Sequence, residues 1–151
     1  METIYVDMDN VLVDFPSGIA RIPDEIRAGY EDRLDEVPGI FGLMDPMPEA
    51  IESYEFLAQH FDTYILSTAP WHNPSAWSDK LLWVQRHLGH AAYKRLILSH
   101  HKNLNDGHYL IDDRTKNGAD RFKGIHIHFG TAEFPNWTSV IGFFKSEINH
   151  E

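Results

Sequence analysis

The chain begins with a short apolar run that leads directly into two acids, Ile4-Tyr5-Val6-Asp7-Met8-Asp9-Asn10-Val11. The apolar residues favour a buried β-strand, so the two acids would stand at its carboxyl end. Buried carboxylates are costly unless other groups pair with them. A divalent cation and a phosphate are natural partners for Asp7 and Asp9, so the rest of the chain should supply the other groups that such a site needs.

The composition predicts one globular domain spanning residues 1–151. No apolar run approaches the roughly 18 residues of a membrane span, and we expect no secretory signal before the first strand. The chain contains no cysteine, which excludes disulfides and thiolate metal sites, and we expect a cytoplasmic location. The net charge of −10 argues against strong binding to nucleic acids. It still permits a small phosphorylated substrate, because a bound cation reverses the local sign of the charge.

Short apolar runs alternate with helical patterns along the chain, which predicts an α/β fold with a parallel sheet. The candidate strands are Thr3–Val6, Thr63–Leu66, Arg95–Leu98, His108–Ile111 and Ile125–Phe129. The first four are continuous apolar runs, as expected for strands buried on both faces of a sheet. The fifth alternates apolar residues with histidines, which predicts a half-exposed strand near an edge.

Three helices are expected between and after these strands. Pro48 and Pro74 are suitable first residues for two of them, the second with Asn73 as its cap. The apolar stripe predicted for the second helix consists of Trp77, Leu81, Val84 and Leu88. The third helix lies between Trp137 and Ile148. Residues 16–47, which include a weak helix at Asp24–Tyr30, are too long for an ordinary crossover, so we interpret them as a small lid inserted after the first strand.

Polar groups follow each of the four most apolar strands. They are Asp7 and Asp9, then Ser67 and Thr68, then Lys102, then Asp112 and Asp113. Because ligands of open α/β sheets bind beyond the carboxyl ends of the strands, we expect these groups to meet. Carboxylates suit Mg²⁺, a hydroxyl and a lysine bind phosphate oxygens, and a carboxylate can act as a covalent nucleophile. The pattern therefore indicates phosphoryl chemistry.

Taken in this order, the motifs resemble those of the haloacid dehalogenase superfamily of phosphotransferases, and within it the 5′(3′)-deoxyribonucleotidases. The matching stretches are Val6–Phe15, Trp83-Val84 with His87-Leu88-Gly89, Leu96–Lys102 and Leu110–Arg114. The resemblance implies a three-layer Rossmann-like fold with a mainly parallel central sheet and a small cap at about residues 16–47. It also implies a Mg²⁺-dependent phosphomonoesterase that acts on deoxynucleoside monophosphates.

The resemblance further implies a role for each residue. Asp7 would be the nucleophile that forms an aspartyl-phosphate, and Asp9 would be the acid and then the base. Thr68 and Lys102 would bind the transferring phosphoryl group. Mg²⁺ would be held by Asp7, by the backbone carbonyl of Asp9, and by Asp112 and Asp113, of which the sequence does not say which contacts the ion directly.

The substrate contacts are the part of the resemblance where this chain departs from the family. Vertebrate members read Thr-Ser-Pro-Ile-Lys at the second motif, whereas this chain reads Thr68-Ala69-Pro70-Trp71-His72. Phe15 matches a position that contacts the nucleobase, and Phe41 and Trp71 could add further walls for a flat base. These three aromatic residues are the predicted substrate contacts. Histidines, among them His101, His126 and His128, are interpreted mainly as surface imidazoles.

Other functions compatible with these residues are a phosphatase for another small ester, such as a sugar phosphate, and a non-hydrolytic phosphate-binding or signalling module. A receiver-type signalling domain also combines acids, a hydroxyl, a lysine and Mg²⁺. It carries its paired acids after the first strand, however, whereas here the pair comes last.

Overall fold

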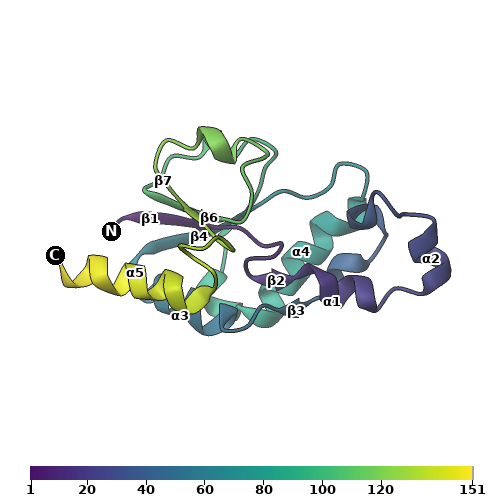
Figure 1. The fold of residues 1–151 in the computed structure, drawn as a ribbon, viewed down its shortest axis with the longest axis horizontal. Helices are drawn as coiled ribbons and strands as arrows, with labels where there is room; N and C mark the ends of the chain where they lie inside the picture. The colour runs from purple at the N-terminus through teal and green to yellow at the C-terminus, as the bar shows by residue number, and fades with distance from the viewer. Residues whose placement is uncertain (151) are drawn as a thin grey trace.

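The centre of the protein is a parallel β-sheet (Figure 1). A computed structural model describes residues 1–150, and within them this sheet has five strands in the order β5-β4-β1-β6-β7. The strands are β1 (Thr3–Val6), β4 (Asp62–Ser67), β5 (Leu96–Leu98), β6 (Tyr109–Asp112) and β7 (Ile125–His128). All four pairings are parallel. The prediction of an α/β fold is confirmed, with each strand displaced by at most one residue at either end.

Of the two edge strands of the sheet, one agrees with the prediction and one does not. β7 forms one edge, as expected from its alternating pattern. The prediction that the run at Arg95–Leu98 is buried on both faces is wrong, because β5 forms the other edge and its three residues are only half-buried. The strand pairs with β4 alone, so its outer side has no neighbouring strand to cover it.

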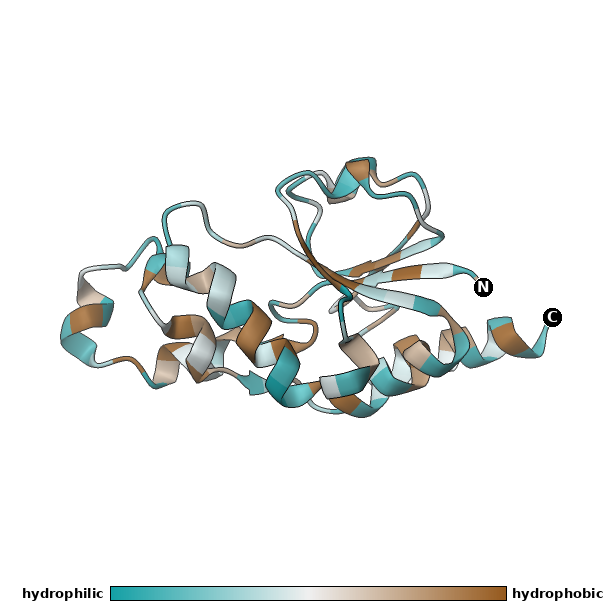
Figure 2. Ribbon diagram, turned by 180° about the vertical axis from the view of Figure 1, so that it is seen from behind, coloured by the Kyte–Doolittle hydropathy of each residue, from teal (hydrophilic) through white to brown (hydrophobic). Residues whose placement is uncertain are grey.

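The two faces of the sheet are covered unequally. Side chains alternate between the faces, so Ile4 and Val6 join one apolar cluster and Tyr5 joins another. The larger cluster contains residues of α3 (Ala50–His60) and α5 (Trp137–Asn149), which run along one face. Among residues 1–150, the elements on the opposite face are η4 (Lys102–Leu104), η5 (Ala119–Arg121) and their loops. The second outer layer is therefore thin, and Figure 2 shows apolar residues both on strands of the sheet and along the helices.

Two predicted helix starts have different outcomes. α4 (Pro74–His87) begins at Pro74, but the Asn73 side chain does not cap it. Its amide donates instead to the backbone carbonyls of Asp35 and Val37, at 2.9 and 3.0 Å. α3 begins at Ala50 rather than Pro48, because Glu49 adopts a left-handed backbone conformation with φ of 65°.

The buried face of α4 is rotated relative to the predicted stripe. Its buried residues are Ala76, Lys80, Trp83 and Val84, together with the helix-ending Leu88. Leu81, which the stripe included, is 45% exposed. None of the helices described in residues 1–150 is both long and apolar enough to cross a membrane.

Residues 13–46, here called the insertion, leave the sheet after β1 and return before α3. The insertion is closed at its base by an antiparallel pair, β2 (Val13–Asp14) and β3 (Asp45–Pro46). Between them lie α1 (Phe15–Ala20), α2 (Asp24–Ala28), η1 (Leu34–Glu36) and η2 (Ile40–Leu43). In Figure 1 these short helices lie beside α4, on the opposite side of the molecule from both termini. Their predicted role as a lid stays a prediction.

Candidate active site

The loop after β1 is held at both ends by backbone hydrogen bonds. The Asp7 amide donates to the Ile111 carbonyl of the neighbouring strand at 2.9 Å. The Met8 carbonyl accepts from the amides of Val11, Leu12 and Val13, which makes a tight turn. Asn10 lies in this turn with φ of 62°, a left-handed conformation that asparagine tolerates better than most residues. The turn fixes the backbone on both sides of Asp7 and Asp9.

Lys102 is buried between two carboxylates. Its side chain is 4% exposed, and its Nζ donates to Asp7 Oδ1 at 3.0 Å and also to Asp112 Oδ2. Burial lowers the pKa of Lys102, but the charges of Asp7 and Asp112 outweigh this effect and raise it. Lys102 is therefore a permanent cation against the predicted nucleophile.

Three carboxylates next to this lysine are arranged as a metal site would require. Oxygen atoms of Asp7, Asp112 and Asp113 lie within 4.8 Å of one another. Burial and the charge of Asp7 raise the pKa of Asp112 to about 6 and that of Asp113 to about 8. Asp113 Oδ1 is buried without a hydrogen-bond partner.

These carboxylates lie close together and have raised pKa values, and one of their oxygens has no hydrogen-bond partner. A divalent cation stabilises the ionised form of such a group. The residues therefore fit such an ion. The contribution predicted for Asp9, through its backbone carbonyl, is not one of these carboxylates and stays a prediction.

A cavity of about 310 Å³ opens over these groups. Its lining residues are Asp7, Asp9, Asp35, Thr68, Pro70, Trp71, His100, Lys102, Asp112, Arg114, Lys116 and Asn117. The Thr68 hydroxyl donates to the Ser99 carbonyl at 2.7 Å, which ties the loops after β4 and β5 together. Lys102, Arg114 and Lys116 bring three cationic side chains to one cavity of a strongly acidic protein. Four carboxylates, from Asp7, Asp9, Asp35 and Asp112, line the same cavity, so it suits an anionic group when a bound cation offsets them.

The three predicted substrate contacts lie in different surroundings. Trp71 lines the cavity just described and is 75% exposed, with its ring 6.0 Å from that of His100. Phe15 lines an adjoining cavity of about 410 Å³ that shares Asp9, Asp35 and Arg114 with the first. Phe41 is only 2% exposed and packs edge-on against Phe15. Its burial makes it part of the packing beneath the site, and its contact with substrate stays a prediction.

Lys80 is a site residue that the sequence reasoning missed. It is fully buried in α4, and its Nζ contacts Asp9 Oδ2 at 3.2 Å. Burial raises the pKa of Asp9, and the charge of Lys80 opposes that rise. A lysine at a buried position of an apolar helix face was the available signal. It was hidden because the predicted stripe placed Leu81 there instead.

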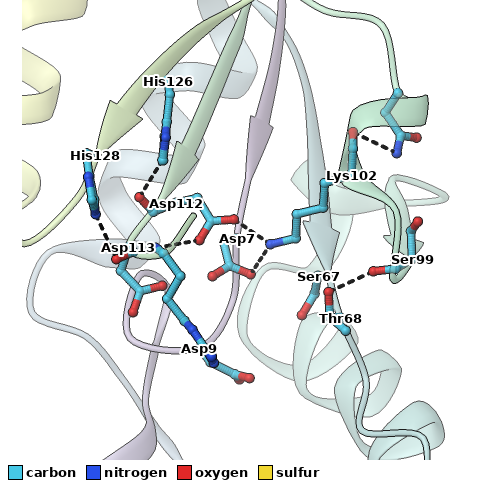
Figure 3. A network of polar contacts seen from close by, with 12 residues as sticks. Asp7, Asp9, Ser67, Thr68, Ser99, Lys102, Asp112, Asp113, His126 and His128 are labelled. Carbon is cyan, nitrogen blue, oxygen red and sulfur yellow. Dashed lines mark hydrogen bonds and ion pairs between the residues drawn. The ribbon is translucent and has the colours of Figure 1, made fainter. Parts of the chain in front are cut away.

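The histidines of β7 also lie closer to the site than predicted. His126 and His128 stack at 4.9 Å, and their Nε2 atoms hydrogen-bond the backbone carbonyls of Asp112 and Asp113, each at 3.0 Å (Figure 3). The interpretation of these two as surface imidazoles is wrong, because they brace the loop that carries the acids. His101 is exposed, and it is His100 that reaches the cavity.

The fold and the site together define a class of protein. A parallel α/β sheet carries an aspartate after its central strand, a hydroxyl and a buried lysine after neighbouring strands, and an acid pair after another. This is the arrangement of the haloacid dehalogenase-like phosphotransferases, as the sequence resemblance implied.

Comparison with known proteins identifies the family within this class. Residues 24–139 match the model of the family described as 5′ nucleotidase, deoxy (Pyrimidine), cytosolic type C protein, and the chain belongs to this family. It is 65% identical over 144 residues to a protein of Vibrio phage KVP40, covering 95% of this chain and 85% of the relative. A Bordetella pertussis protein is 35% identical, covering 91% and 94% of the two chains. The names of both assign them provisionally to the 5′(3′)-deoxyribonucleotidases.

A human relative extends the comparison. The human 5′(3′)-deoxyribonucleotidase of cytosolic type is 28% identical over 169 residues, covering 91% of this chain and 78% of the relative. The predicted membership of a nucleotidase family is thereby confirmed.

Proposed function

We propose that the protein is a Mg²⁺-dependent 5′(3′)-deoxyribonucleotidase that hydrolyses deoxynucleoside monophosphates in the cytoplasm. The observation that carries the proposal is the Lys102 ammonium buried between Asp7 and Asp112 at the floor of a cavity with three cationic side chains. A buried carboxylate paired with a fixed cation is a suitable nucleophile toward phosphorus. The family and the named relatives support the same activity.

The reaction proceeds in two displacements at phosphorus. In the first, an Asp7 oxygen forms a bond to phosphorus while the bond to the nucleoside oxygen breaks, and Asp9 gives its proton to that oxygen. In the second, water attacks the aspartyl-phosphate, Asp9 takes a proton from the water, and the bond from phosphorus to Asp7 breaks. Inorganic phosphate and the nucleoside leave, and both carboxyl groups return to their starting states. Burial raises the pKa of Asp9, which favours the protonated form that the first step requires.

The residues that would hold Mg²⁺ are Asp7, Asp112 and Asp113, with the backbone carbonyl of Asp9. When bound, the ion would neutralise charge on the phosphoryl oxygens and on the crowded carboxylates. Lys102 and the Thr68 hydroxyl would contact the remaining phosphoryl oxygens. For Thr68 this requires its hydroxyl proton to turn from the Ser99 carbonyl toward the substrate.

The nucleoside would extend from the phosphate site into one of two adjoining spaces. The space beside Phe15 has a wall of carboxylates from Glu31, Asp32 and Asp35, which can accept hydrogen bonds from a base or a sugar. Trp71 borders the other space. We assign the base to the side of Phe15, where the ring is supported from below by Phe41.

The test is a phosphatase assay with Mg²⁺ over deoxynucleoside monophosphates, ribonucleotides, sugar phosphates and p-nitrophenyl phosphate. Deoxynucleoside monophosphates should give the highest kcat/KM, and Asp7→Asn should abolish phosphate release, since it removes the nucleophile. Lys145→Met, on the exposed side of α5, is the control and should leave turnover unchanged. Unchanged turnover in Asp7→Asn would overturn the mechanism. Preference for sugar phosphates would favour the alternative substrate class, and binding without hydrolysis would favour a binding module.

A further inference from the structure

Lys80 is a buried cation that the reaction described above does not use. Its side chain is 0% exposed, and it extends from α4 toward the loop after β4. Its Nζ donates to Ser67 Oγ at 2.7 Å and to the Thr68 carbonyl at 3.0 Å. Two neutral oxygens from the sheet therefore fix the position of the ammonium group.

The third partner of this ammonium is the Asp9 carboxylate. Lys80 Nζ lies 3.2 Å from Asp9 Oδ2, whereas Asp9 Oδ1 is buried with no hydrogen-bond partner. Figure 3 shows that Asp9 lies apart from the cluster of Asp7, Lys102 and Asp112. Lys80 is thus the cation that determines where the Asp9 carboxylate stands, and it leaves one Asp9 oxygen free.

Lys80 also contacts the insertion. Its Nζ lies 4.6 Å from the centre of the Phe41 ring, a cation–π contact. One turn further along α4, the Trp83 indole donates to the Met44 carbonyl at 3.0 Å. The same helix that carries Lys80 is therefore fastened to the insertion, so the ammonium is clamped between Phe41 and the end of β4.

The cost of burying a cation argues that this arrangement is more than packing. An ammonium loses several kcal/mol of hydration when it leaves water, and a buried ion pair replaced as a whole by well-packed apolar residues is often at least as stable. The neighbouring buried residues of α4 are apolar, so an apolar side chain would suit this helix face. A methionine at position 80 would fill the same space without the charge.

We propose that Lys80 is a positioning residue of the phosphatase reaction, one that holds the Asp9 carboxylate in place for proton transfer. The inference rests on the proposed function, because it assigns Asp9 the proton transfers. A displacement of about 1 Å at a reacting group can cost on the order of 10²-fold in rate. The charge of Lys80 should therefore matter for kcat and little for KM, since it does not line the cavity in which the phosphate would bind.

The experiment is a double-mutant cycle between Lys80→Met and Asp9→Asn. Lys80→Met alone should lower kcat for a deoxynucleoside monophosphate by roughly 10- to 100-fold with nearly unchanged KM. In the Asp9→Asn background the same change should have almost no further effect, because the carboxylate that it positions is gone. Multiplicative losses in the double variant, or wild-type kcat in Lys80→Met, would overturn the proposal. Lys145→Met is the matched control and should behave as wild type.

A second variant and a second measurement guard against loss of activity in Lys80→Met for an unrelated reason, such as misfolding. Ser67→Ala keeps the lysine but removes one of its anchors, and it should lower kcat in the same direction by a smaller factor. Crystal structures of the wild type and Lys80→Met provide a readout without turnover. The Asp9 carboxylate should leave its wild-type position in the variant, and an unmoved carboxylate would refute the positioning role. If the wild-type protein hydrolyses no phosphate ester, the proposed function fails, and the structures still decide whether Lys80 positions Asp9.

Discussion

Charged side chains differ in their burial between the carboxyl ends of the strands and the insertion. At the carboxyl ends of the strands, the side chains of Asp7, Lys102 and Asp112 are each less than one tenth exposed, and Lys102 contacts both carboxylates directly. In the insertion, Arg21 and Asp45 form an ion pair with side chains that are 47% and 56% exposed. Buried charges fix one geometry, whereas solvated ones tolerate change. The difference suggests that the chemistry belongs to the sheet and that the insertion can vary to suit the substrate.

The strongest test of this contrast is Lys102→Met. Removing one partner of a buried ion pair leaves uncompensated charge, so the free energy of unfolding should fall by roughly 3–5 kcal/mol and hydrolysis should be lost. Urea unfolding in metal-free buffer and a phosphate-release assay measure the two effects. The exposed Lys145→Met is the reference, and equal stability of the two variants would contradict the assigned burial cost.

The carboxylates of Asp112 and Asp113 should also make the folding stability depend on pH in an unusual way. The pKa values of about 6 for Asp112 and about 8 for Asp113 lie above the value of about 4 expected in the unfolded chain. The folded protein therefore binds more protons than the unfolded chain across this interval, and its stability should fall as pH rises from about 4 to about 8. Bound Mg²⁺ should weaken that trend, because it stabilises the ionised carboxylates.

Urea unfolding at several pH values, with EDTA and with Mg²⁺, checks this prediction. Asp113→Asn should remove part of the decline in the metal-free series. The same slope in both series would argue against a metal at these carboxylates.

A smaller effect, on KM alone, is expected for aromatic residues where the insertion meets the cavity. Phe15→Ala should raise KM for a deoxynucleoside monophosphate about tenfold, because base stacking on an aromatic ring contributes on the order of 1–3 kcal/mol. Trp71→Ala should change KM less. For p-nitrophenyl phosphate, which carries no base, neither variant should differ much from wild type. A larger effect of Trp71→Ala would move the base to the opposite side of the phosphate.

The smallest effect on stability and activity is expected for the exposed ion pair of the insertion, Arg21 and Asp45. Arg21 lowers the pKa of Asp45, mainly through their hydrogen bond, so the pair contributes stability above the ordinary aspartate pKa and loses it as pH falls. Because both groups are solvated, Asp45→Asn should change the melting temperature little and leave kcat as in wild type. Thermal unfolding and the standard assay check this, and a large loss of activity would show that the insertion is part of the chemistry after all.

Strand positions and motif residues could be predicted because local patterns determine them. Apolar runs marked each strand of the five-stranded sheet to within a residue, and the parallel topology then brought Asp7, Thr68, Lys102 and Asp112 to one cavity, with Asp113 beside Asp7 and Asp112. Lys80 could not be found in this way. Its burial depends on the rotation of α4 against the insertion, which is a long-range packing result. The bracing of Asp112 and Asp113 by His126 and His128 likewise depends on the pairing of β7 with β6.

The place of β1 at the middle of the sheet has a consequence for fluctuations. The Asp7 amide is bonded to Ile111 with paired strands on both sides, so it should exchange its hydrogen only when the whole domain unfolds. The short helices of the insertion, of which η2 packs on α4 and α1, should open at a lower free energy than β1, because they lie outside the sheet. Partial opening would then expose the proposed base-binding side while Asp7 keeps its place, so substrate exchange need not disturb the proposed nucleophile.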